Sequence, residues 1–180
     1  MRGVSLKEFN MLVGCPKDRE QAAKSEIQYF IGDLLSDTNL IITVTNISGL
    51  ITCRTSRDPF HVVHRLREFA LENPYQFRFA IRFTPLEYCV ESNLAVLAET
   101  ARQLLQRINE HETFRVTVRR RQTTLGNMEV IKTIAEEIPR TVNLDDPDRT
   151  IWVEIVGDMT GISVLNERTD ILSITAMEKT

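Results

Sequence analysis

The chain has 180 residues, of which 42% are hydrophobic, and its formal net charge at pH 7 is −3. This length allows one larger domain or two small ones. No stretch reaches the ~18 consecutive apolar residues that a transmembrane helix needs, and the N-terminal residues lack the charged-then-apolar layout of a signal peptide. We therefore expect a cytoplasmic protein that does not enter a membrane.

Three cysteines, Cys15, Cys53 and Cys89, are scattered along the chain without C-x-x-C spacing. An odd, dispersed set argues against both a disulfide framework and a zinc ribbon. Each cysteine stands beside an apolar run, so we expect buried structural thiols.

Hydrophobic spacing in the first half predicts two helices among several short strands. In chain order, the predicted elements are a strand at 9–15, a helix at 18–35, a hairpin of strands at 40–44 and 50–54, a helix at 59–73 and a strand at 77–83. Asp58 and Pro59 have the residue types of a helix cap and a first helical position. The order strand, helix, hairpin, helix, strand is that of a ferredoxin-like sandwich, in which helices cover one face of a sheet.

Pro85 begins a second run of elements. A helix at 91–108 is predicted by apolar residues at every third or fourth position, without Gly or Pro. The elements expected after it are a strand at 113–119, a short helix at 128–138, an extended piece at 142–144, strands at 151–156 and 162–165, and one more candidate strand at 171–174. The sequence thus predicts an α/β (α+β) protein, with a ferredoxin-like domain at 1–84 and a second domain at 85–180.

Charge is distributed unevenly along the second half. Between residues 113 and 140 the basic residues outnumber the acidic ones, and they are Arg115, Arg119, Arg120, Arg121, Lys132 and Arg140. From residue 143 to residue 158 the balance is reversed, with five acidic residues against Arg149. A local basic face can bind phosphate even when the whole chain is acidic.

Arg119, Arg120 and Arg121 follow one another at the end of the predicted strand at 113–119. Adjacent strand residues alternate between faces, so the three guanidinium groups cannot all enter a core. We expect them to face solvent where the strand ends, where each planar guanidinium can donate two hydrogen bonds to a phosphate. The alternative is an ordinary solvated run of charge.

Arg78 and Arg82 are four residues apart in the predicted strand at 77–83, so they would share one of its faces. Together with Arg54 and Arg57 they would extend the basic surface across the first domain. The alternative is that these arginines only make the uncovered face of a sheet soluble.

Other polar and aromatic residues are assigned ordinary structural roles. His61 and His64 are spaced i, i+3, but no further ligand of suitable spacing accompanies them, so we expect a helix surface and no metal. The acidic run at 145–148 lacks the glycine and the terminal Glu of an EF-hand loop and is predicted to be a turn. Trp152 has apolar neighbours on both sides and is predicted to be a core residue rather than a platform for stacking bases.

Sequence motifs for catalysis are absent. None of the patterns G-x-x-x-x-G-K, G-x-G-x-x-G, G-x-S-x-G or H-E-x-x-H occurs. With seven glycines in the chain, no phosphate cradle for acetyl-CoA, ATP or S-adenosylmethionine is visible. We therefore expect no cofactor and no enzymatic activity.

Four consecutive segments of the second half carry a family resemblance. They are TFRVTVRRRQ, GNMEVIKTIAEEI, VNLDDPDRTIWVEIVGD and TGISVL. This run closely resembles the THUMP domain, an α/β RNA-binding module of tRNA-modifying enzymes. The resemblance spans residues 114–165, and the ferredoxin-like domain before it fits, because THUMP domains commonly follow such a domain.

The resemblance implies that the chain binds tRNA, and no DNA is expected. The candidate RNA-binding residues are Arg119, Arg120, Arg121, Lys132 and Arg140, with Arg78, Arg82, Arg54 and Arg57 in the first domain. THUMP enzymes carry a separate catalytic domain, for which we expect no room in this chain. It therefore resembles the stand-alone THUMP proteins that act as tRNA-binding adaptors for the acetyltransferase that makes 4-acetylcytidine.

Three other functions stay open at this point. The first is the RNA-binding subunit of a different tRNA-modifying enzyme. The second is a ferredoxin-like regulatory or ligand-binding module without RNA, and the third is an enzyme with an unrecognised site. The ligand-binding module needs a small-molecule pocket rather than a basic face, so a salt titration of RNA binding separates it from the RNA-binding functions.

Overall fold

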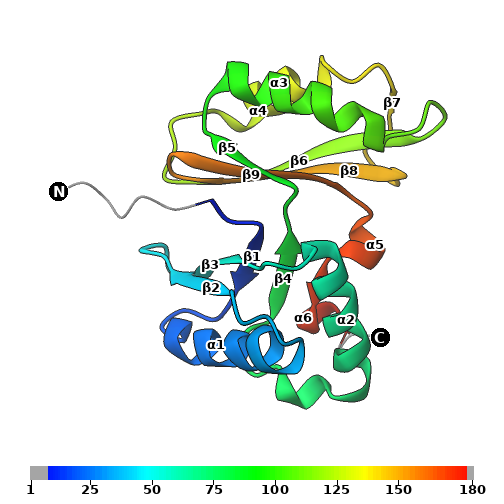
Figure 1. Ribbon diagram of the computed structural model, residues 1–180. Helices are drawn as coiled ribbons and strands as arrows, with labels where there is room; N and C mark the ends of the chain where they lie inside the picture. Colours follow the sequence, from blue (N-terminus) through cyan, green and yellow to red (C-terminus); the bar gives the residue numbers. More distant parts are fainter. Residues whose placement is uncertain (1–7, 178–180) are drawn as a thin grey trace. The chain divides into compact units, whose positions relative to one another are not determined.

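The computed structural model describes residues 8–177 of the chain (Figure 1). These residues form two compact units, each with its own sheet and its own hydrophobic core. Of the described residues, the N-terminal unit contains 9–86 together with 168–177, and the central unit contains residue 8 together with 87–167.

The observed division differs from the predicted domains at the C-terminal end. The sequence placed the first boundary between residues 84 and 85, close to the observed break after residue 86. It assigned all of 85–180 to the second domain, whereas the structure places 168–177 in the N-terminal unit. Residues 1–7 and 178–180, which the predicted domains included, lie outside the described residues.

The N-terminal unit is built on an antiparallel sheet in the order β10-β4-β1-β3-β2. Its strands are β1 (Met11–Gly14), β2 (Ile41–Val44), β3 (Leu50–Arg54), β4 (Arg82–Pro85) and β10 (Leu172–Ser173). The chain order of β1, α1, β2, β3, α2 and β4 is the predicted β-α-β-β-α-β order. Strand β10 adds a further strand beside β4.

Helical segments cover one face of this sheet. They are α1 (Glu20–Ile27), which continues into the π-helical segment η1 (Gln28–Leu34), and α2 (Pro59–Glu72), which is followed by the 3-10 turn η2 (Pro74–Gln76). The start of α2 is as predicted, because the Asp58 side chain accepts a hydrogen bond from the Phe60 N–H at 2.9 Å. Phe30 and Phe77 stack in the core with ring centroids 4.1 Å apart.

The predicted strand at 77–83 is wrong for its first five residues, because β4 begins at Arg82. The Glu26 carboxylate, on α1, accepts hydrogen bonds from the backbone N–H groups of Phe79 (2.9 Å) and Ala80 (3.0 Å). These groups are satisfied by a side chain rather than by a neighbouring strand. The alternating apolar pattern of this segment therefore comes from a loop that packs onto the core.

The C-terminal segment belongs to the N-terminal unit through backbone and side-chain contacts. Its helical turns are α5 (Glu167–Asp170), whose first residue still belongs to the central unit, and α6 (Ile174–Met177). Arg67, on α2, donates from Nη1 to the carbonyl oxygen of Ile171 at 2.6 Å. His64 Nε2 lies 2.8 Å from Asp170 Oδ1, so this histidine does more than cover a helix surface.

The central unit contains a second sheet in the order β5-β9-β8-β6-β7. Its elements are β5 (Tyr88–Glu91), α3 (Leu94–Leu104), η3 (Leu105–Arg107), β6 (Thr113–Arg121), α4 (Asn127–Ala135), β7 (Thr141–Val142), β8 (Arg149–Val156) and β9 (Met159–Leu165). Strand β6 is parallel to β7 and β8, while β9 is antiparallel to β8 and β5. The helices and strands predicted between residues 91 and 165 are confirmed with shifted ends, while the extended piece predicted at 142–144 overlaps β7 only at residue 142. Strand β5 was missed, because four residues are too few to show a clear period.

Helices α3 and α4 pack on the same face of the central sheet (Figure 1). Phe114, Val116 and Val118 of β6 contribute to this core, as their alternation predicted. The pairings make β5 parallel to β6, since β9 is antiparallel to both β5 and β8. The two helices follow these two strands. Both therefore begin next to the C-terminal ends of β5 and β6, along the same edge of the sheet.

We expect Leu172→Ala to destabilise the N-terminal unit, because Leu172 is completely buried in its core. The expected loss in the free energy of unfolding is about 2–5 kcal/mol, measured by urea denaturation with circular dichroism. Thr175→Ala in α6, which removes an exposed side chain, is the matched control and should change the stability by less than about 0.5 kcal/mol. Equal stability of both variants would contradict the placement of β10 in this core.

Candidate nucleic-acid interface

Arg119, Arg120 and Arg121 are the last three residues of β6 and do not point in the same direction. Alternation along the strand places Arg120 on the side covered by helices and the other two on the opposite face. Arg119 and Arg120 are exposed, whereas only 25% of the Arg121 side chain is exposed. The expectation that all three face solvent therefore holds for the first two.

Arg121 is partly buried because it pairs with a carboxylate on the neighbouring strand. Glu154 of β8 lies on the same sheet face, opposite Arg119 in the strand register. Its side chain is 3% exposed. Glu154 Oε2 accepts a hydrogen bond from Arg121 Nη1 at 2.5 Å, and Oε1 accepts one from Trp152 Nε1 at 2.8 Å. These two donors offset the cost of burying the charge.

Trp152 in turn contacts Arg119. The Cζ atom of Arg119 lies over the indole ring, 5.1 Å from the ring centroid, which is within the range of a cation–π interaction. Trp152 is buried, as predicted, and its indole nitrogen is bound to Glu154. Arg119, Trp152, Glu154 and Arg121 therefore form one continuous set of contacts, which we call the arginine–tryptophan cluster.

Arg120 is held differently. On the helix side of the sheet, its Nη1 donates to the carbonyl oxygen of Leu125 at 3.1 Å, in the loop that joins β6 to α4. The chain enters this loop through Gln122, whose φ of +53° lies in the left-handed region. Arg120 thus has one backbone contact and an exposed side chain that can reach an anion in solvent.

Backbone contacts bring the start of α3 close to the end of β6. The Gly157 N–H donates to the Arg121 carbonyl oxygen at 2.9 Å, and the Ser92 N–H donates to the Asp158 carbonyl oxygen at 2.8 Å. The end of β6, the β8–β9 turn and the start of α3 are therefore neighbours. Helix N-termini carry partial positive charge, which adds to that of the exposed arginines.

Helix α4 begins at the same edge and carries the predicted residue Lys132. Its N-terminal flanking residue is Gly126, which supplies no side-chain cap, and Glu129 lies in its first turn. Lys132 is exposed, and its Nζ lies 4.0 Å from Glu136 Oε1, a spacing that contributes little to stability. Lys132 lies in the last turn of α4 rather than at the start of the helix, so its exposed side chain can meet an anion but is not placed beside the three consecutive arginines.

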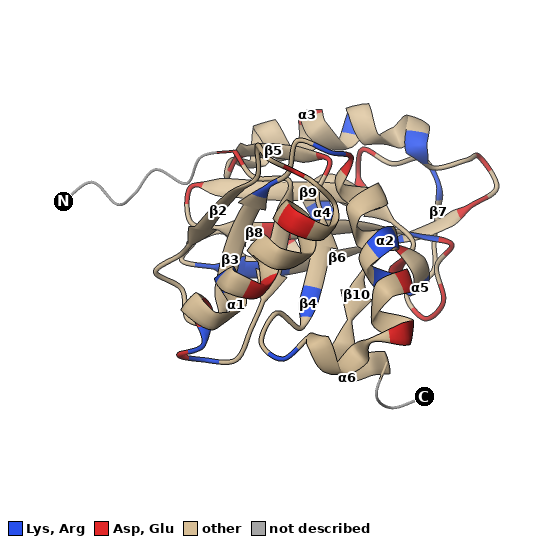
Figure 2. Ribbon diagram, turned by 60° about the horizontal axis from the view of Figure 1, so that its bottom comes forward, with Lys and Arg blue, Asp and Glu red and all other residues tan. Residues whose placement is uncertain are grey.

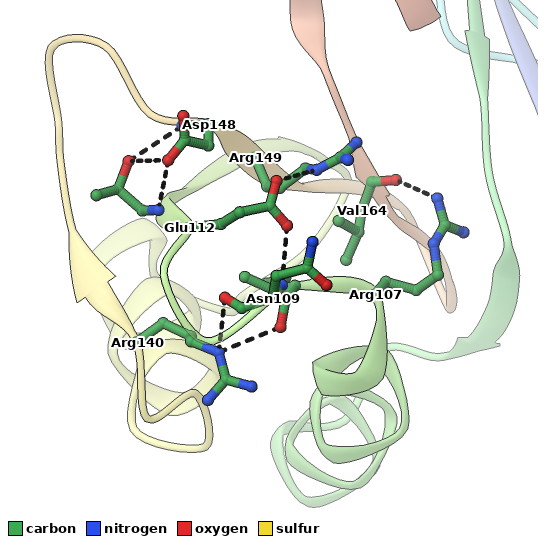
Figure 3. A network of polar contacts seen from close by, with 9 residues as sticks. Arg107, Asn109, Glu112, Arg140, Asp148, Arg149 and Val164 are labelled. Carbon is green, nitrogen blue, oxygen red and sulfur yellow. Dashed lines mark hydrogen bonds and ion pairs between the residues drawn. The ribbon is translucent and has the colours of Figure 1, made fainter.

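Arg140 lies at the other end of β6 from the three consecutive arginines. It directly precedes Thr141 of β7, which pairs with Thr113, the first residue of β6. Its Nε donates to the carbonyl oxygens of Ile108 (3.1 Å) and Asn109 (3.0 Å) (Figure 3). The two ends of β6 are about 26 Å apart at the usual rise of a strand, so the structure does not bring Arg140 together with those arginines.

The other four predicted RNA-binding residues belong to the N-terminal unit. They are Arg54, Arg57, Arg78 and Arg82. Arg57 donates from Nη2 to the Ser36 carbonyl oxygen at 3.1 Å, and the Cζ atom of Arg78 lies 5.5 Å from the Phe79 ring centroid. Arg78 and Arg82 do not share a strand face, because residue 78 precedes β4. The basic strand face predicted from their spacing is therefore wrong.

A network of polar contacts closes the end of the central unit where β6 begins (Figure 3). Glu112 accepts hydrogen bonds from the Asn109 N–H (2.8 Å) and from Arg149 Nε (2.9 Å). The Asn109 N–H, together with Arg149, holds the pKa of Glu112 below its ordinary value. Asp148 Oδ2 accepts from the Thr113 N–H at 2.8 Å. These side chains form hydrogen bonds with one another and with nearby backbone N–H groups, and they stabilise the loops at this end of the central unit.

The acidic loop that follows β7 is a turn, as predicted (Figure 2). The Asn143 side-chain oxygen accepts hydrogen bonds from the backbone N–H groups of Asp145 (3.1 Å) and Asp146 (3.0 Å). Within residues 8–177, no group of three or more His, Cys, Asp or Glu side chains is placed to hold a metal ion. No helix in this part of the chain is long and apolar enough to span a membrane.

Glu154 is the part of the interface that the sequence did not predict. It stands out only as the single acidic residue in the apolar segment IWVEIV. A buried carboxylate needs hydrogen-bond donors, so its position in such a segment is a usable signal for a polar contact. The identity of the donors depends on the register of β6 against β8.

Comparison with known families identifies the central unit. The family model of the THUMP domain matches residues 91–165, from the end of β5 to the end of β9. The chain therefore contains a THUMP domain, which confirms the resemblance found in the sequence. A search of curated proteins found no match.

Solved structures share the fold over most of the chain. PH1313 from Pyrococcus horikoshii Ot3 matches 92% of this chain, with a TM-score of 0.67 and 18% identity. TrmN from Thermus thermophilus matches 86%, with a TM-score of 0.57 and 16% identity. A 4-thiouridine synthetase, solved as an RNA complex with bound ATP, matches 92%, with a TM-score of 0.55 and 12% identity. The present chain covers 55%, 44% and 42% of these chains, about half of their length, and at such identities the likeness shows the fold alone.

We expect Glu154→Ala to destabilise the central unit, because it leaves the buried Trp152 N–H without its acceptor. The expected cost is about 1–3 kcal/mol. It is measured by urea unfolding followed through Trp152, the only tryptophan of the chain, whose emission should also change in the folded state. Glu110→Ala, at an exposed position, is the control. If both variants unfolded like the wild type, the cluster would have no structural role.

Proposed function

We propose that the protein binds RNA at the edge of its THUMP domain where β6 ends, and that this RNA is tRNA. The observation that carries the proposal is the pair of exposed arginines, Arg119 and Arg120, at an edge that also holds two helix N-termini. THUMP domains are RNA-binding modules of tRNA-modifying enzymes, and a 4-thiouridine synthetase with a similar fold was solved with RNA. Arginine side chains suit the phosphates of RNA, because their planar groups donate paired hydrogen bonds.

We further propose that the protein is a non-catalytic adaptor, which presents tRNA to the acetyltransferase that makes 4-acetylcytidine. Two observations support this role. The sequence contains a THUMP domain, and it contains no G-x-x-x-x-G-K or G-x-G-x-x-G motif for nucleotide or cofactor binding. Such an adaptor acts by raising the effective concentration of tRNA at a catalytic site on another protein. The likeness to the thiouridine synthetase favours a second candidate, RNA binding on behalf of a different tRNA-modifying enzyme.

Binding of tRNA should weaken steeply with salt, because log affinity falls against log salt by about 0.7–0.9 for each phosphate neutralised. We expect the double variant Arg119→Glu/Arg120→Glu to lose tRNA binding while remaining folded, with a lower melting temperature because the new carboxylate at position 119 lies opposite Glu154. Fluorescence anisotropy of labelled tRNA, titrated at several salt concentrations, measures both effects. The charge-matched control is Lys24→Glu/Arg65→Glu, at exposed positions of α1 and α2.

Two outcomes would contradict this proposal at different levels. Normal binding by the arginine variant would place the RNA interface elsewhere in the chain. A wild-type protein that does not bind tRNA even at ~50 mM salt, where phosphate contacts are strong, would remove the RNA-binding function itself.

In a reconstituted reaction with the acetyltransferase, acetyl-CoA, ATP and tRNA, we expect this protein to increase tRNA acetylation. Alone, it should modify nothing. The Arg119→Glu/Arg120→Glu variant should stimulate less, because it holds less tRNA near the catalytic site. Equal acetylation with and without the protein would remove the adaptor role and leave RNA binding intact. Acetylation by this chain alone would show that it is an enzyme.

A further inference from the structure

The three consecutive arginines differ in what surrounds them. Arg121 is paired with the buried Glu154 carboxylate at 2.5 Å, so its charge is largely compensated within the protein. Arg120 is exposed, and its Nη1 donates to the Leu125 carbonyl oxygen. Arg119 is exposed and lies over the ring of a buried tryptophan. One sequence run therefore supplies three arginines with different capacities to bind RNA.

The position of Arg119 over an indole ring leaves part of its guanidinium open to a second planar group. The side chain is exposed, although its Cζ atom lies 5.1 Å from the centre of the Trp152 ring. Unpaired nucleobases stack on planar guanidinium groups as well as on aromatic rings. Within residues 8–177, the side-chain contact of Arg119 is with the Trp152 ring, so its N–H donors can reach a phosphate or the edge of a base.

The support under Arg119 is ordered before any RNA arrives. Trp152 is fixed through its indole nitrogen by Glu154, and Glu154 is fixed by Arg121. All three side chains come from neighbouring positions of β6 and β8, so the strand register positions them. A preordered group loses less conformational entropy on binding than a free arginine does, which favours its use as a binding platform.

We propose that Arg119 is a stacking site for an unpaired nucleobase of the bound RNA, and that Arg120 contacts phosphate. Trp152 and Glu154 are positioning residues, which hold the Arg119 guanidinium in place without touching the RNA. This proposal rests on the proposed RNA-binding function and adds a chemical class of ligand to one residue of the interface. It assigns different roles in RNA binding to two neighbouring arginines that have the same charge.

Exchange of each arginine for lysine tests the proposal, because lysine keeps the charge and still binds phosphate but has no planar group. The probes are a short single-stranded oligoribonucleotide and an abasic oligomer with the same sugar-phosphate backbone. The wild type should bind the base-bearing oligomer about 5- to 150-fold more tightly, as expected for one stacked base. Arg119→Lys should lose most of this preference and keep the salt dependence. Arg120→Lys, the matched comparison, should weaken the binding of both oligomers by a similar factor, because lysine cannot make paired hydrogen bonds to phosphate, and should keep the preference between them.

Substitution of the tryptophan supplies a second, independent test. Trp152→Leu removes the ring under Arg119 and should reduce the preference for the base-bearing oligomer as Arg119→Lys does, again without a change in salt dependence. Trp152→Phe keeps an aromatic ring and should restore part of the preference. Because Trp152 is buried, thermal melting of each variant shows whether the protein used for binding is folded.

The possible results distinguish this inference from the function on which it rests. If the wild type binds the two oligomers equally, or if folded Arg119→Lys retains the preference, the stacking site is overturned while RNA binding stands. If the wild type binds neither the oligomers nor tRNA, both the stacking site and the RNA-binding function are overturned. A preference lost in Arg119→Lys and kept in Arg120→Lys supports the assignment of the two roles.

Discussion

The parallel pairing of β6 with β8 is the constraint on which the candidate interface depends. It aligns Arg119 with Glu154 across the two strands and brings Trp152 and Arg121 to the same sheet face. A parallel pair needs a crossover connection, which here contains α4 and β7. That connection covers the opposite face and starts α4 at the edge where the arginines emerge. The pairing that organises the core therefore also determines the chemistry of this edge.

Glu154 makes that pairing specific. A buried carboxylate is costly unless donors reach it, and it receives one from each of the two strands, through Arg121 of β6 and Trp152 of β8. A shift of the register by one residue would move every side chain of a strand to the other face. Such a shift would bury the charge without its donors. The network thus disfavours alternative pairings while it orders the side chains of the candidate interface.

The two ends of the central sheet use charged residues in opposite ways. Where β6 begins, Arg149 donates a hydrogen bond to the Glu112 carboxylate, and Arg140 donates to the backbone carbonyl oxygens of Ile108 and Asn109 (Figure 3). Where β6 ends, Arg119 and Arg120 keep exposed guanidinium groups. Counting charges along the chain does not separate these cases. An arginine is a candidate ligand for RNA only when its donors are not already used within the fold.

The sequence by itself determined most helices and strands of the THUMP domain, because helical and strand periodicity are properties of neighbouring residues, and the order of its segments indicated the family of that domain. It did not determine which basic residues lie together. Residues 77–81 have the alternating pattern of a strand but form a loop. The conformation of this loop depends on the Glu26 carboxylate, which accepts a hydrogen bond from the Phe79 N–H and lies 53 residues away from it in the chain. The roles of the consecutive arginines depend on Glu154, which is 33 residues from Arg121. Only the tertiary structure decided these points, because the groups that satisfy a buried charge or a loop N–H come from elements distant in sequence.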